Sequence, residues 1–245
     1  MISKNQIKYL HSLETKKGRK KENAFVAEGP KVVADLMKLQ KPLSVFATEE
    51  WLAENPMECA VVVTEDELRK ISFLQHPQQV MAVFPMFENG NTVVDTEKLC
   101  LALDGVQDPG NLGTIIRIAD WFGITDIFCS QDTADVYNPK VVQATMGSIA
   151  RVNVVYTDLC KLLAELPSDF PVYGTFLDGE NIYSKNLSTN GLVIMGNEGK
   201  GISAPVAKFV NSKLLIPNYP AGRETADSLN VAIATAITCS EFRRG

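Results

Sequence analysis

The sequence is poor in the residues that build the commonest catalytic and metal sites. It contains only two histidines among 245 residues, His11 and His76, and neither has a Ser, Cys or ligand partner at a telling spacing. A histidine-centred triad and a histidine-rich metal site are therefore disfavoured as the basis of function, and we predict no bound metal.

Paired cysteines and long apolar runs are also missing. The five cysteines are widely spaced without a C-x-x-C, which is typical of small buried hydrophobic residues in a reducing compartment. No run of about 18 uncharged apolar residues occurs, and the first residues lack the apolar core of a signal peptide. We expect a cytoplasmic protein whose length and 45% hydrophobic content suit one large or two small domains.

Acidic residues outnumber basic ones, but the basic residues are unevenly spread. The chain carries 24 Lys and Arg against 29 Asp and Glu, a net charge of −5, which disfavours a generic polyanion binder. Residues 1–31 nevertheless hold eight Lys or Arg against three Glu, so this end is +5 and the remainder is −10. The basic end is either a surface that touches phosphates or a solvated, flexible loop, and charge alone does not choose.

The first third of the chain alternates short apolar runs with amphipathic stretches. Strands are expected at residues 24–27, 43–47, 59–63 and 80–84, and helices at residues 6–13, 30–39, 49–54 and 65–72. The stretch KKGRKKEN, residues 16–23, is interpreted as a polar, basic turn. The alternation predicts a small α/β layer domain over residues 1–88.

A turn-rich stretch at residues 85–96, PMFENGNTVVDT, is predicted to be a linker because it lacks a sustained period. The alternation then restarts. Strands are expected at residues 99–103, 127–129, 152–156, 172–176, 192–195 and 214–216, and helices at residues 111–122, 139–149, 159–166, 205–209 and 229–242. This repetition predicts a mostly parallel sheet over residues 97–245, with ligands beyond the carboxyl ends of its strands.

A glycine-rich turn follows the strand expected at residues 192–195. The stretch LVIMGNEGKGIS places a single carboxylate, Glu198, among three glycines. It is not an ordinary phosphate loop, because Ile202 stands where G-x-x-x-x-G-K-[ST] needs its lysine. The spacing of G-x-G-x-x-G is also absent. A glycine turn alone is more often structural, so its meaning depends on the rest of the chain.

Two further loops carry polar residues beside apolar helices. In DPGNLGTIIRIAD, Asn111 could cap a helix, and Arg117 could either pair with Asp120 or reach a partner outside its apolar run. In PAGRETADSLNV, Ser228 is expected to cap the last helix. Asn230 would then lie in the first turn, close to the core, and would need a hydrogen-bonding partner.

Taken in order, N-L-G-T-I-I-R, I-M-G-N-E-G-x-G and I-P…S-L-N-V-A-I-A-T-A-I resemble the three motifs of the SpoU (TrmH-like) RNA ribose 2′-O-methyltransferases of the SPOUT class. The resemblance covers roughly residues 99–245. Ahead of it, F-x-x-E-G-x-K-V at residues 25–32 is similar to the ribosomal-protein-L30e-like, RNA-substrate-binding domain often fused in front. One departure is the loop at residues 217–228, whose twelve positions exceed the family's length.

The resemblance implies a carboxy-terminal α/β domain with a deep trefoil knot that binds S-adenosylmethionine (AdoMet). It implies methyl transfer to a ribose 2′-hydroxyl of ribosomal or transfer RNA, by a homodimer packed through the knot and the last helix. The implied site residues are catalytic Arg117, Asn111, Glu198, Ser228 and Asn230; cofactor-binding Gly196, Ile216, Leu229, Thr175 and Met195; and RNA-binding Lys16, Lys17, Arg19, Lys20, Lys21, Arg151 and Arg223.

The role of Arg117 stays open at this point. A guanidinium with a pKa above about 12 is a poor base near neutral pH, so Arg117 either activates the hydroxyl, as the family assigns, or clamps a neighbouring phosphate. Two other functions compete with ribose methylation. One is a SPOUT relative that methylates a base nitrogen, which Asn111, Arg117 and residues 228–230 disfavour. The other is a non-catalytic RNA-binding or ribosome-associated protein, which the presence of all five polar residues disfavours.

Overall fold

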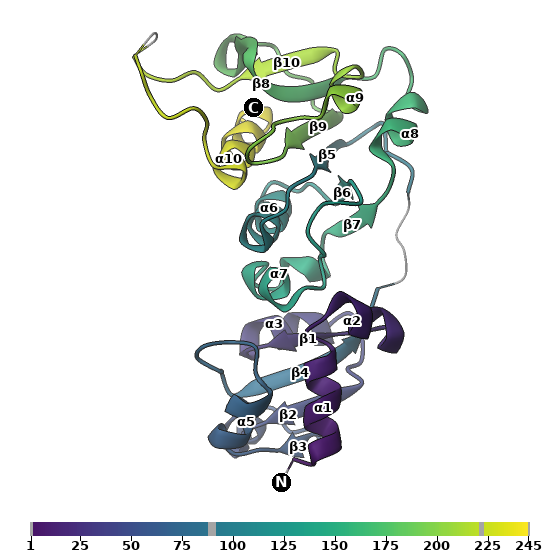
Figure 1. Ribbon diagram of the computed structural model, residues 1–245, viewed down its shortest axis with the longest axis vertical. Coiled ribbons are helices and arrows are strands. Elements are labelled where there is room, and N and C mark those ends of the chain that lie inside the picture. The colour runs from purple at the N-terminus through teal and green to yellow at the C-terminus, as the bar shows by residue number, and fades with distance from the viewer. Residues whose placement is uncertain (1, 88–91, 221–222, 245) are drawn as a thin grey trace. The chain divides into compact units, whose positions relative to one another are not determined.

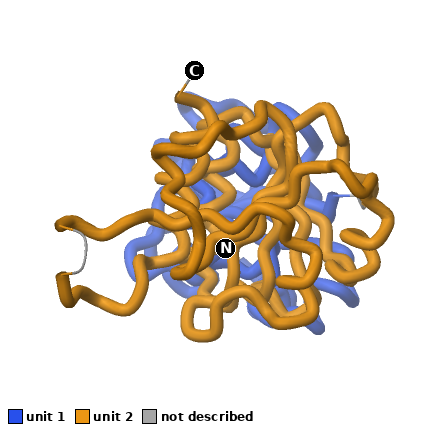
Figure 2. The backbone as a smooth tube through the Cα atoms, turned by 90° about the horizontal axis from the view of Figure 1, so that it is seen from above, with its two compact units in different colours: residues 1–88, 135–150 blue, residues 89–134, 151–245 orange. Residues whose placement is uncertain are grey.

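The computed structural model describes residues 2–87, 92–220 and 223–244 (Figure 1). The chain divides into two compact units (Figure 2). Unit 1 comprises residues 1–88 and 135–150, and unit 2 comprises residues 89–134 and 151–245. The middle of the predicted linker, residues 88–91, lies outside the described residues. No helix in the described part of the chain is long and apolar enough to cross a bilayer.

Unit 1 is built on a four-stranded mixed sheet. Its elements are α1 (Lys4–Ser12), α2 (Lys16–Glu22), β1 (Ala24–Glu28), α3 (Pro30–Met37), β2 (Ser44–Ala47), α4 (Glu49–Glu54), β3 (Val61–Val62), α5 (Glu65–Ile71) and β4 (Val80–Pro85). The strand order is β1-β4-β2-β3, in which β4 runs antiparallel to both neighbours and β3 runs parallel to β2. Every residue of β1 is buried, because α2, α3 and the segment at residues 135–150 pack against it.

The basic stretch predicted as a turn is a helix, α2, and this corrects the sequence interpretation. The Thr15 hydroxyl caps its first turn by accepting from the Gly18 N–H at 3.1 Å, and Asn23 ends it in the left-handed region at φ 47°. The helix forms despite its run of lysines because it also has a buried side. Arg19 is only 2% exposed, and tertiary packing there outweighs a weak local preference.

Residues 135–150 belong to unit 1 although the sequence placed them within the second domain. The ring of Tyr137 packs on Phe25 at 4.9 Å between centroids, and its hydroxyl accepts a hydrogen bond from the Phe87 N–H at 3.0 Å. Asp135 forms an ion pair with Arg19 at 2.6 Å. These contacts join positions 50 to 116 residues apart, so sequence periodicity could not reveal them.

The helix expected at residues 139–149 is interrupted. Helix α7 spans Pro139–Ala144, and a short 3₁₀ helix, η1, spans Ser148–Ala150. Between them Met146 and Gly147 have φ angles of 51° and 94°, which an α-helix cannot accommodate. Gly147 also lies against Asp35, where a Cβ would come within 2.5 Å of a carboxylate oxygen. The glycine therefore permits both the turn and the close approach.

Unit 2 contains a six-stranded sheet in which all neighbouring strands are parallel. Its elements are β5 (Leu99–Asp104), α6 (Pro109–Trp121), β6 (Asp126–Cys129), β7 (Asn153–Tyr156), α8 (Leu159–Ala164), β8 (Val172–Asn181), η2 (Ile182–Ser184), β9 (Gly191–Gly196), α9 (Ala204–Ala207), β10 (Ser212–Leu215) and α10 (Val231–Phe242). The order is β10-β8-β9-β5-β6-β7. The predicted α/β class with a parallel carboxy-terminal sheet is confirmed; the threading of the knot stays a prediction.

The sheet order brings distant segments together at its centre. Strands β9 and β5 are neighbours although about ninety residues separate them, and every residue of β9 is buried. The order reverses direction between β5 and β9, and in open parallel sheets ligands bind beyond the carboxyl ends of strands at such a point. In unit 2, α10 packs against α6 and β9. The ends of β8, β9 and β10 and the start of α10 therefore surround one region.

Three of the five cysteines fit the expectation of small buried hydrophobic residues. Burial raises the pKa of the Cys100 thiol to about 11 and that of Cys239 to about 12, and it also raises the pKa of Cys129. These thiols stay protonated and apolar at neutral pH. Cys59 is exposed and Cys160 is half-buried, so the expectation was wrong for Cys59.

Candidate active site

A cavity of about 380 Å³ lies in unit 2 at the ends of β8, β9 and β10. It is bounded by residues that follow these strands and by the beginning of α10. All five residues predicted to contact the cofactor line this cavity: Thr175, Met195, Gly196, Ile216 and Leu229. Glu198 and Ser228 line it as well. The structure thus brings together four segments of the chain, and Thr175 and Leu229 are 54 positions apart in the sequence.

The glycine-rich turn after β9 is folded back tightly on itself. Asn197 and Gly201 form a bridge in which each backbone N–H donates to the other's carbonyl, at 3.0 and 2.9 Å. A Cβ at position 196 would lie 2.2 Å from the carbonyl carbon of Gly201. Any larger residue at position 196 would therefore displace the backbone at Gly201. Because Gly196 has no side chain, its main-chain groups are exposed at the cavity wall.

A series of hydrogen bonds connects the three motifs at the edge of this cavity. The Asn230 amide donates to Asn111 Oδ1 at 2.9 Å, and the Asn111 amide donates to Glu198 Oε1 at 3.1 Å. Asn111 comes from the first turn of α6, Glu198 from the turn after β9, and Asn230 from the start of α10. The residues predicted as catalytic from three separate motifs thus include one continuous set, Asn230–Asn111–Glu198.

Glu198 is held both by its own turn, where the Asn197 amide donates to Oε2 at 3.5 Å, and by groups from another loop. Its carboxylate also accepts hydrogen bonds from the backbone N–H groups of Asp108 at 3.3 Å and Gln107 at 3.4 Å. Partial burial on its own would raise the pKa of Glu198, but the bonds from Asn111 and the backbone outweigh burial and lower that pKa. The carboxylate is therefore fully ionised at neutral pH and is occupied in joining two loops.

The helix caps differ from the sequence expectation at two positions. Asn230, not Ser228, caps α10, since its Oδ1 accepts from the N–H groups of Ala232 at 3.0 Å and Ile233 at 3.3 Å. Asp108, not Asn111, caps α6 and accepts from the Asn111 N–H at 2.8 Å. Sequence rules rank Ser and Asn almost equally as caps, so they could not choose. With Asn230 and Asp108 as the caps, Ser228 lines the cavity, and the Asn111 side chain donates to Glu198.

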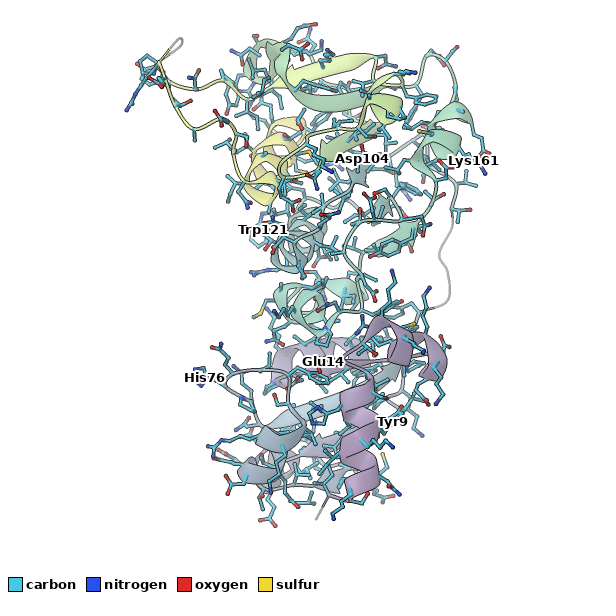
Figure 3. The ribbon with its side chains drawn as sticks, in the orientation of Figure 1. Tyr9, Glu14, His76, Asp104, Trp121 and Lys161 are labelled. Carbon is cyan, nitrogen blue, oxygen red and sulfur yellow. The ribbon has the colours of Figure 1, made fainter. Side chains whose placement is uncertain are left out.

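Arg117 is exposed on α6 and makes no hydrogen bond or ion pair with any residue the structure describes. Its expected local partner, Asp120, is bound instead by Arg151, with three N–O distances of 2.7 to 3.1 Å. Trp121, labelled in Figure 3, lies one turn beyond Arg117 on α6 and is 85% exposed. The guanidinium is therefore available to a ligand rather than engaged in the fold.

Two residues that support the site were missed in the sequence. Asn197 donates to the Gly105 carbonyl at 2.7 Å and accepts from the N–H groups of Gly199 and Lys200, both at 3.0 Å. Asp104, labelled in Figure 3, ends β5 and accepts from the Ser203 N–H at 2.7 Å. Both fasten the glycine-rich turn to the end of β5. The sequence signal that could have identified both residues is a polar side chain at the end of a buried strand or directly after it.

The predicted RNA-binding residues fall into two groups. Lys16, Lys17, Lys20 and Lys21 are exposed on α2 in unit 1, and Arg223 is exposed in unit 2. Arg19 is buried with Asp135 and cannot contact RNA, so that prediction was wrong. Arg151 is half-exposed at 47% but is bound to Asp120. Counting charges along the sequence could not separate these cases.

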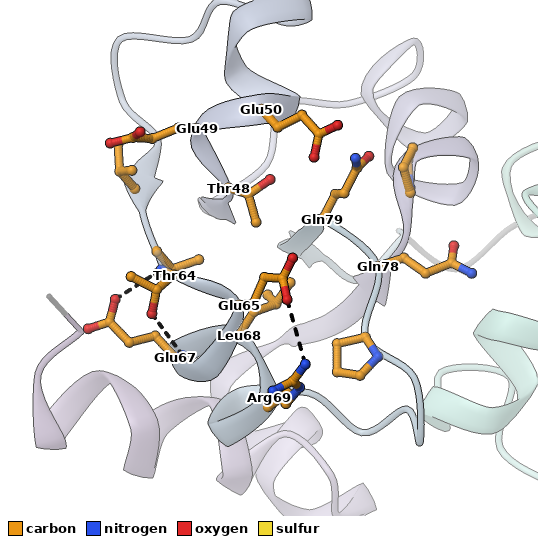
Figure 4. Close-up of a pocket in the computed structure, with 14 residues that line it drawn as sticks. Thr48, Glu49, Glu50, Thr64, Glu65, Glu67, Leu68, Arg69, Gln78 and Gln79 are labelled. Atoms are coloured by element: carbon orange, nitrogen blue, oxygen red, sulfur yellow. Dashed lines mark hydrogen bonds and ion pairs between the residues drawn. The ribbon is translucent and has the colours of Figure 1, made fainter.

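A larger cavity of about 940 Å³ lies in unit 1, far in sequence from the three motifs (Figure 4). Four glutamates line it, and Glu65 forms an ion pair with Arg69 at 3.6 Å. Glu67 instead belongs to the cap of α5, where it accepts from the Thr64 N–H. The cavity contains none of the motif residues, and its carboxylates would repel RNA phosphates. We therefore take the smaller cavity of unit 2 as the active site.

Comparison with known proteins agrees with this assignment. A model of the SpoU rRNA methylase family matches residues 98–240, and a model of the MRM3-like substrate binding domain matches residues 4–82. The 23S rRNA (guanosine(2553)-2′-O)-methyltransferase RlmP of Bacillus subtilis is 34% identical over 248 residues, covering 98% of this chain and 97% of that protein. The 23S rRNA (guanosine-2′-O-)-methyltransferase RlmB of Neisseria meningitidis is 29% identical over 91% of each chain.

Solved structures resemble the whole chain. An RNA methyltransferase of the TrmH family from Porphyromonas gingivalis superposes with a TM-score of 0.89 at 43% identity and full coverage of both chains. The AdoMet-bound rRNA methyltransferase of Sinorhizobium meliloti superposes with a TM-score of 0.86 at 30% identity, covering 100% of this chain and 97% of that one. The family model, the full-length relatives and the three converging motifs together establish that this chain belongs to the SpoU rRNA methylase family.

Proposed function

We propose that the protein transfers a methyl group from AdoMet to the ribose 2′-hydroxyl of a guanosine in 23S ribosomal RNA, a cytoplasmic substrate. The observation that carries this proposal is the hydrogen-bonded set Asn230–Asn111–Glu198 at the edge of the unit 2 cavity. This set joins residues from all three motifs, and helix α6, which carries Asn111, also carries Arg117, which has no partner among the described residues. The guanosine and the 23S rRNA are taken from the names of the Bacillus and Neisseria relatives.

The cavity suits AdoMet in size and in chemistry. Its volume of about 380 Å³ lies in the range of small-molecule sites, about 300–1,000 Å³. Main-chain groups of Gly196, Ile216 and Leu229 would hold the adenosine part, with Thr175 and Met195 as the wall. No phosphate-binding lysine is needed, because AdoMet carries no phosphate. When bound, AdoMet supplies a methyl group on a sulfonium that is already a good leaving group.

The protein's own residues then have two tasks, to orient the RNA and to assist loss of the hydroxyl proton. Glu198 is a poor candidate for a base, because its lowered pKa and its hydrogen bonds commit it to holding Asn111 and the neighbouring loop. We assign Glu198 and Asn230 as positioning residues. Arg117 remains charged at every relevant pH and suits a phosphate beside the target nucleotide, which it can grip through two donors.

We also propose that the protein is a homodimer through α6 and α10. Helix α10 carries apolar or small side chains from Val231 to Cys239, and Ile233 among them is 52% exposed; Leu229, just before the helix, is 51% exposed. Trp121 on the neighbouring α6 is 85% exposed. Apolar side chains gathered on two packed helices are costly in water, which favours a second copy as their cover. Sedimentation analysis of the wild type against Trp121→Asp would test this, and a monomeric wild type would refute it.

The function is tested by mass spectrometry of nucleosides from 23S rRNA of cells with and without the gene. We expect one 2′-O-methylguanosine to disappear in the deletion strain and to return with the wild-type gene. The purified protein and AdoMet should restore the same methyl group on rRNA from the deletion strain. A change confined to base-methylated nucleosides, or no change in any RNA, would overturn the proposal.

A further inference from the structure

We propose that the solvent face of α2 in unit 1 is a docking surface for the RNA phosphate backbone, and that Arg19 is the positioning residue that fastens this surface to the fold. This inference rests on the proposed function in taking RNA as the substrate. It assigns the first contact to four lysines outside the catalytic cavity: Lys16, Lys17, Lys20 and Lys21.

The four lysines share one face of the helix. They are all exposed, and Lys20 and Lys21 lie one turn beyond Lys16 and Lys17, so side chains of like charge are neighbours. Only Lys21 has a described partner, the adjacent Glu22 at 3.1 Å, and that lysine is 79% exposed. An ion pair this exposed is weak, so Glu22 neutralises the charge of Lys21 only in part. The face therefore presents concentrated positive charge to solvent.

Local helix stability does not explain this arrangement. Cations in the last turn of a helix are favourable, which accounts for Lys20 and Lys21. Lys16 and Lys17 lie in the first turn, at the positive end of the helix dipole, and no acidic residue is there. Neighbouring like charges add a further penalty of a few tenths of a kcal/mol per pair. A ligand of opposite charge would offset both costs.

The opposite side of α2 is fastened at two points. Gly18 packs so closely on α1 that a Cβ there would lie 1.8 Å from the Ser12 carbonyl oxygen. The Arg19 guanidinium donates to the carbonyls of Leu13 at 2.9 Å and Glu14 at 2.6 Å, and it pairs with Asp135 at 2.6 Å. The lysines are thus carried on a fixed platform, and binding need not order a flexible segment first.

The chemistry of this surface fits a backbone rather than a base sequence. Helix α2 has no aromatic side chain to stack on a base and no amide side chain to read a base edge. The cavity of unit 1 that is lined by four glutamates would repel phosphates, and it includes β3, at the far edge of the sheet from β1. Since α2 packs on β1, positive and negative charge are separated to opposite edges.

The test compares two full-length variants of equal charge. The first replaces Lys16, Lys17, Lys20 and Lys21 by Gln. The matched control replaces Lys4, Lys8, Lys41 and Lys70 by Gln, which are also exposed lysines of unit 1 without an ion pair among the described residues. The binding of an unmodified 23S rRNA transcript is measured as a function of salt, together with calorimetric AdoMet affinity and the melting temperature of each variant.

We expect the α2 variant to lose at least tenfold in RNA affinity at 0.1 M salt, whereas the control loses less than threefold. The slope of log affinity against log salt should fall by about 3 in the α2 variant, since each phosphate contact contributes about 0.7 to 0.9. Equal losses in the two variants, or an unchanged slope, would overturn the inference. AdoMet affinity should be the same in both variants. A wild type that binds RNA but neither binds AdoMet nor transfers a methyl group would instead refute the proposed function.

Discussion

Two arginines, one in each unit, show how the fold decides what a charged side chain can do. Arg19 in α2 is 2% exposed and uses its donors on two carbonyls and the carboxylate of Asp135. Arg117 in α6 is exposed and bonds to no described residue, because Arg151 has taken Asp120, its nearest acidic neighbour. Both arginines were candidates for RNA or catalysis, yet only one has donors left for a ligand.

The difference lies in the neighbours rather than in the arginines. A guanidinium has five N–H donors, and burial favours pairing them with acceptors inside the protein. In Arg19 the two terminal nitrogens bond to Leu13, Glu14 and Asp135, and the buried Nε has no partner among the described residues. In α6 the Asp120 carboxylate lies one turn from Arg117, but Arg151 already binds it. The comparison therefore predicts that replacing Arg19 lowers stability, whereas replacing Arg117 lowers catalytic activity.

The largest expected effect is on stability, from Arg19→Met. The change leaves the Asp135 carboxylate, only 15% exposed, and two carbonyls without their donor, so unit 1 should lose about 3–5 kcal/mol. Denaturation can be followed by the fluorescence of the buried Trp51 in a Trp121→Phe background. Arg117→Met is the control and should stay within about 0.5 kcal/mol. Adding Asp135→Leu to Arg19→Met should recover most of the lost free energy of unfolding. If Arg19→Met alone loses less than about 1 kcal/mol, the contrast between the two arginines is wrong.

The next effect is on turnover, from Arg117→Lys. A lysine keeps the charge but not the two-donor geometry, so the methyl-transfer rate should fall by about 100- to 1,000-fold. AdoMet affinity should change less than twofold, because Arg117 does not line the cavity. Single-turnover transfer of labelled methyl to an rRNA transcript and calorimetry with AdoMet measure the two quantities. Near-normal transfer by the lysine variant would remove Arg117 from the mechanism.

The smallest effect tests whether Arg151 keeps Arg117 free. Arg151→Gln releases the Asp120 carboxylate, which can then pair with Arg117 three residues earlier on α6. Such helix pairs are worth about 0.2–0.5 kcal/mol, so turnover should fall about twofold. Adding Asp120→Asn should restore it. If the double variant stays as slow as Arg151→Gln, Arg151 acts on RNA directly and not through Asp120.

Much of unit 2 could be read from the sequence because its signals are local. Each buried strand is a short apolar run, and each following helix has its own period and cap signals, so the order of elements was predicted almost completely. The site residues were predicted from the resemblance of three motifs to the SpoU family, and these motifs lie directly after strands, where parallel sheets place their ligands. The five cofactor candidates all line one cavity for this reason.

The errors share a different origin. Residues 16–23 were taken for a turn because the buried anchor of α2 lies at Asp135, far along the chain. The packing of residues 135–150 with unit 1 could not be predicted, because Tyr137 contacts Phe25, far back along the chain. The cap of α10 was assigned to Ser228 instead of Asn230 because cap preferences rank Ser and Asn almost equally. In the first two cases the deciding contact spans more than a hundred residues.

The sequence alone determined the succession of strands and helices, the three motifs and the residue types that chemistry needs, because these depend on neighbours along the chain. Only the tertiary structure decided which polar groups remain available, since that depends on partners brought together by folding. It bound Arg19 to Asp135 and Asp120 to Arg151, joined Glu198 to Asn230 through Asn111, and so left Arg117 and the lysines of α2 for a ligand.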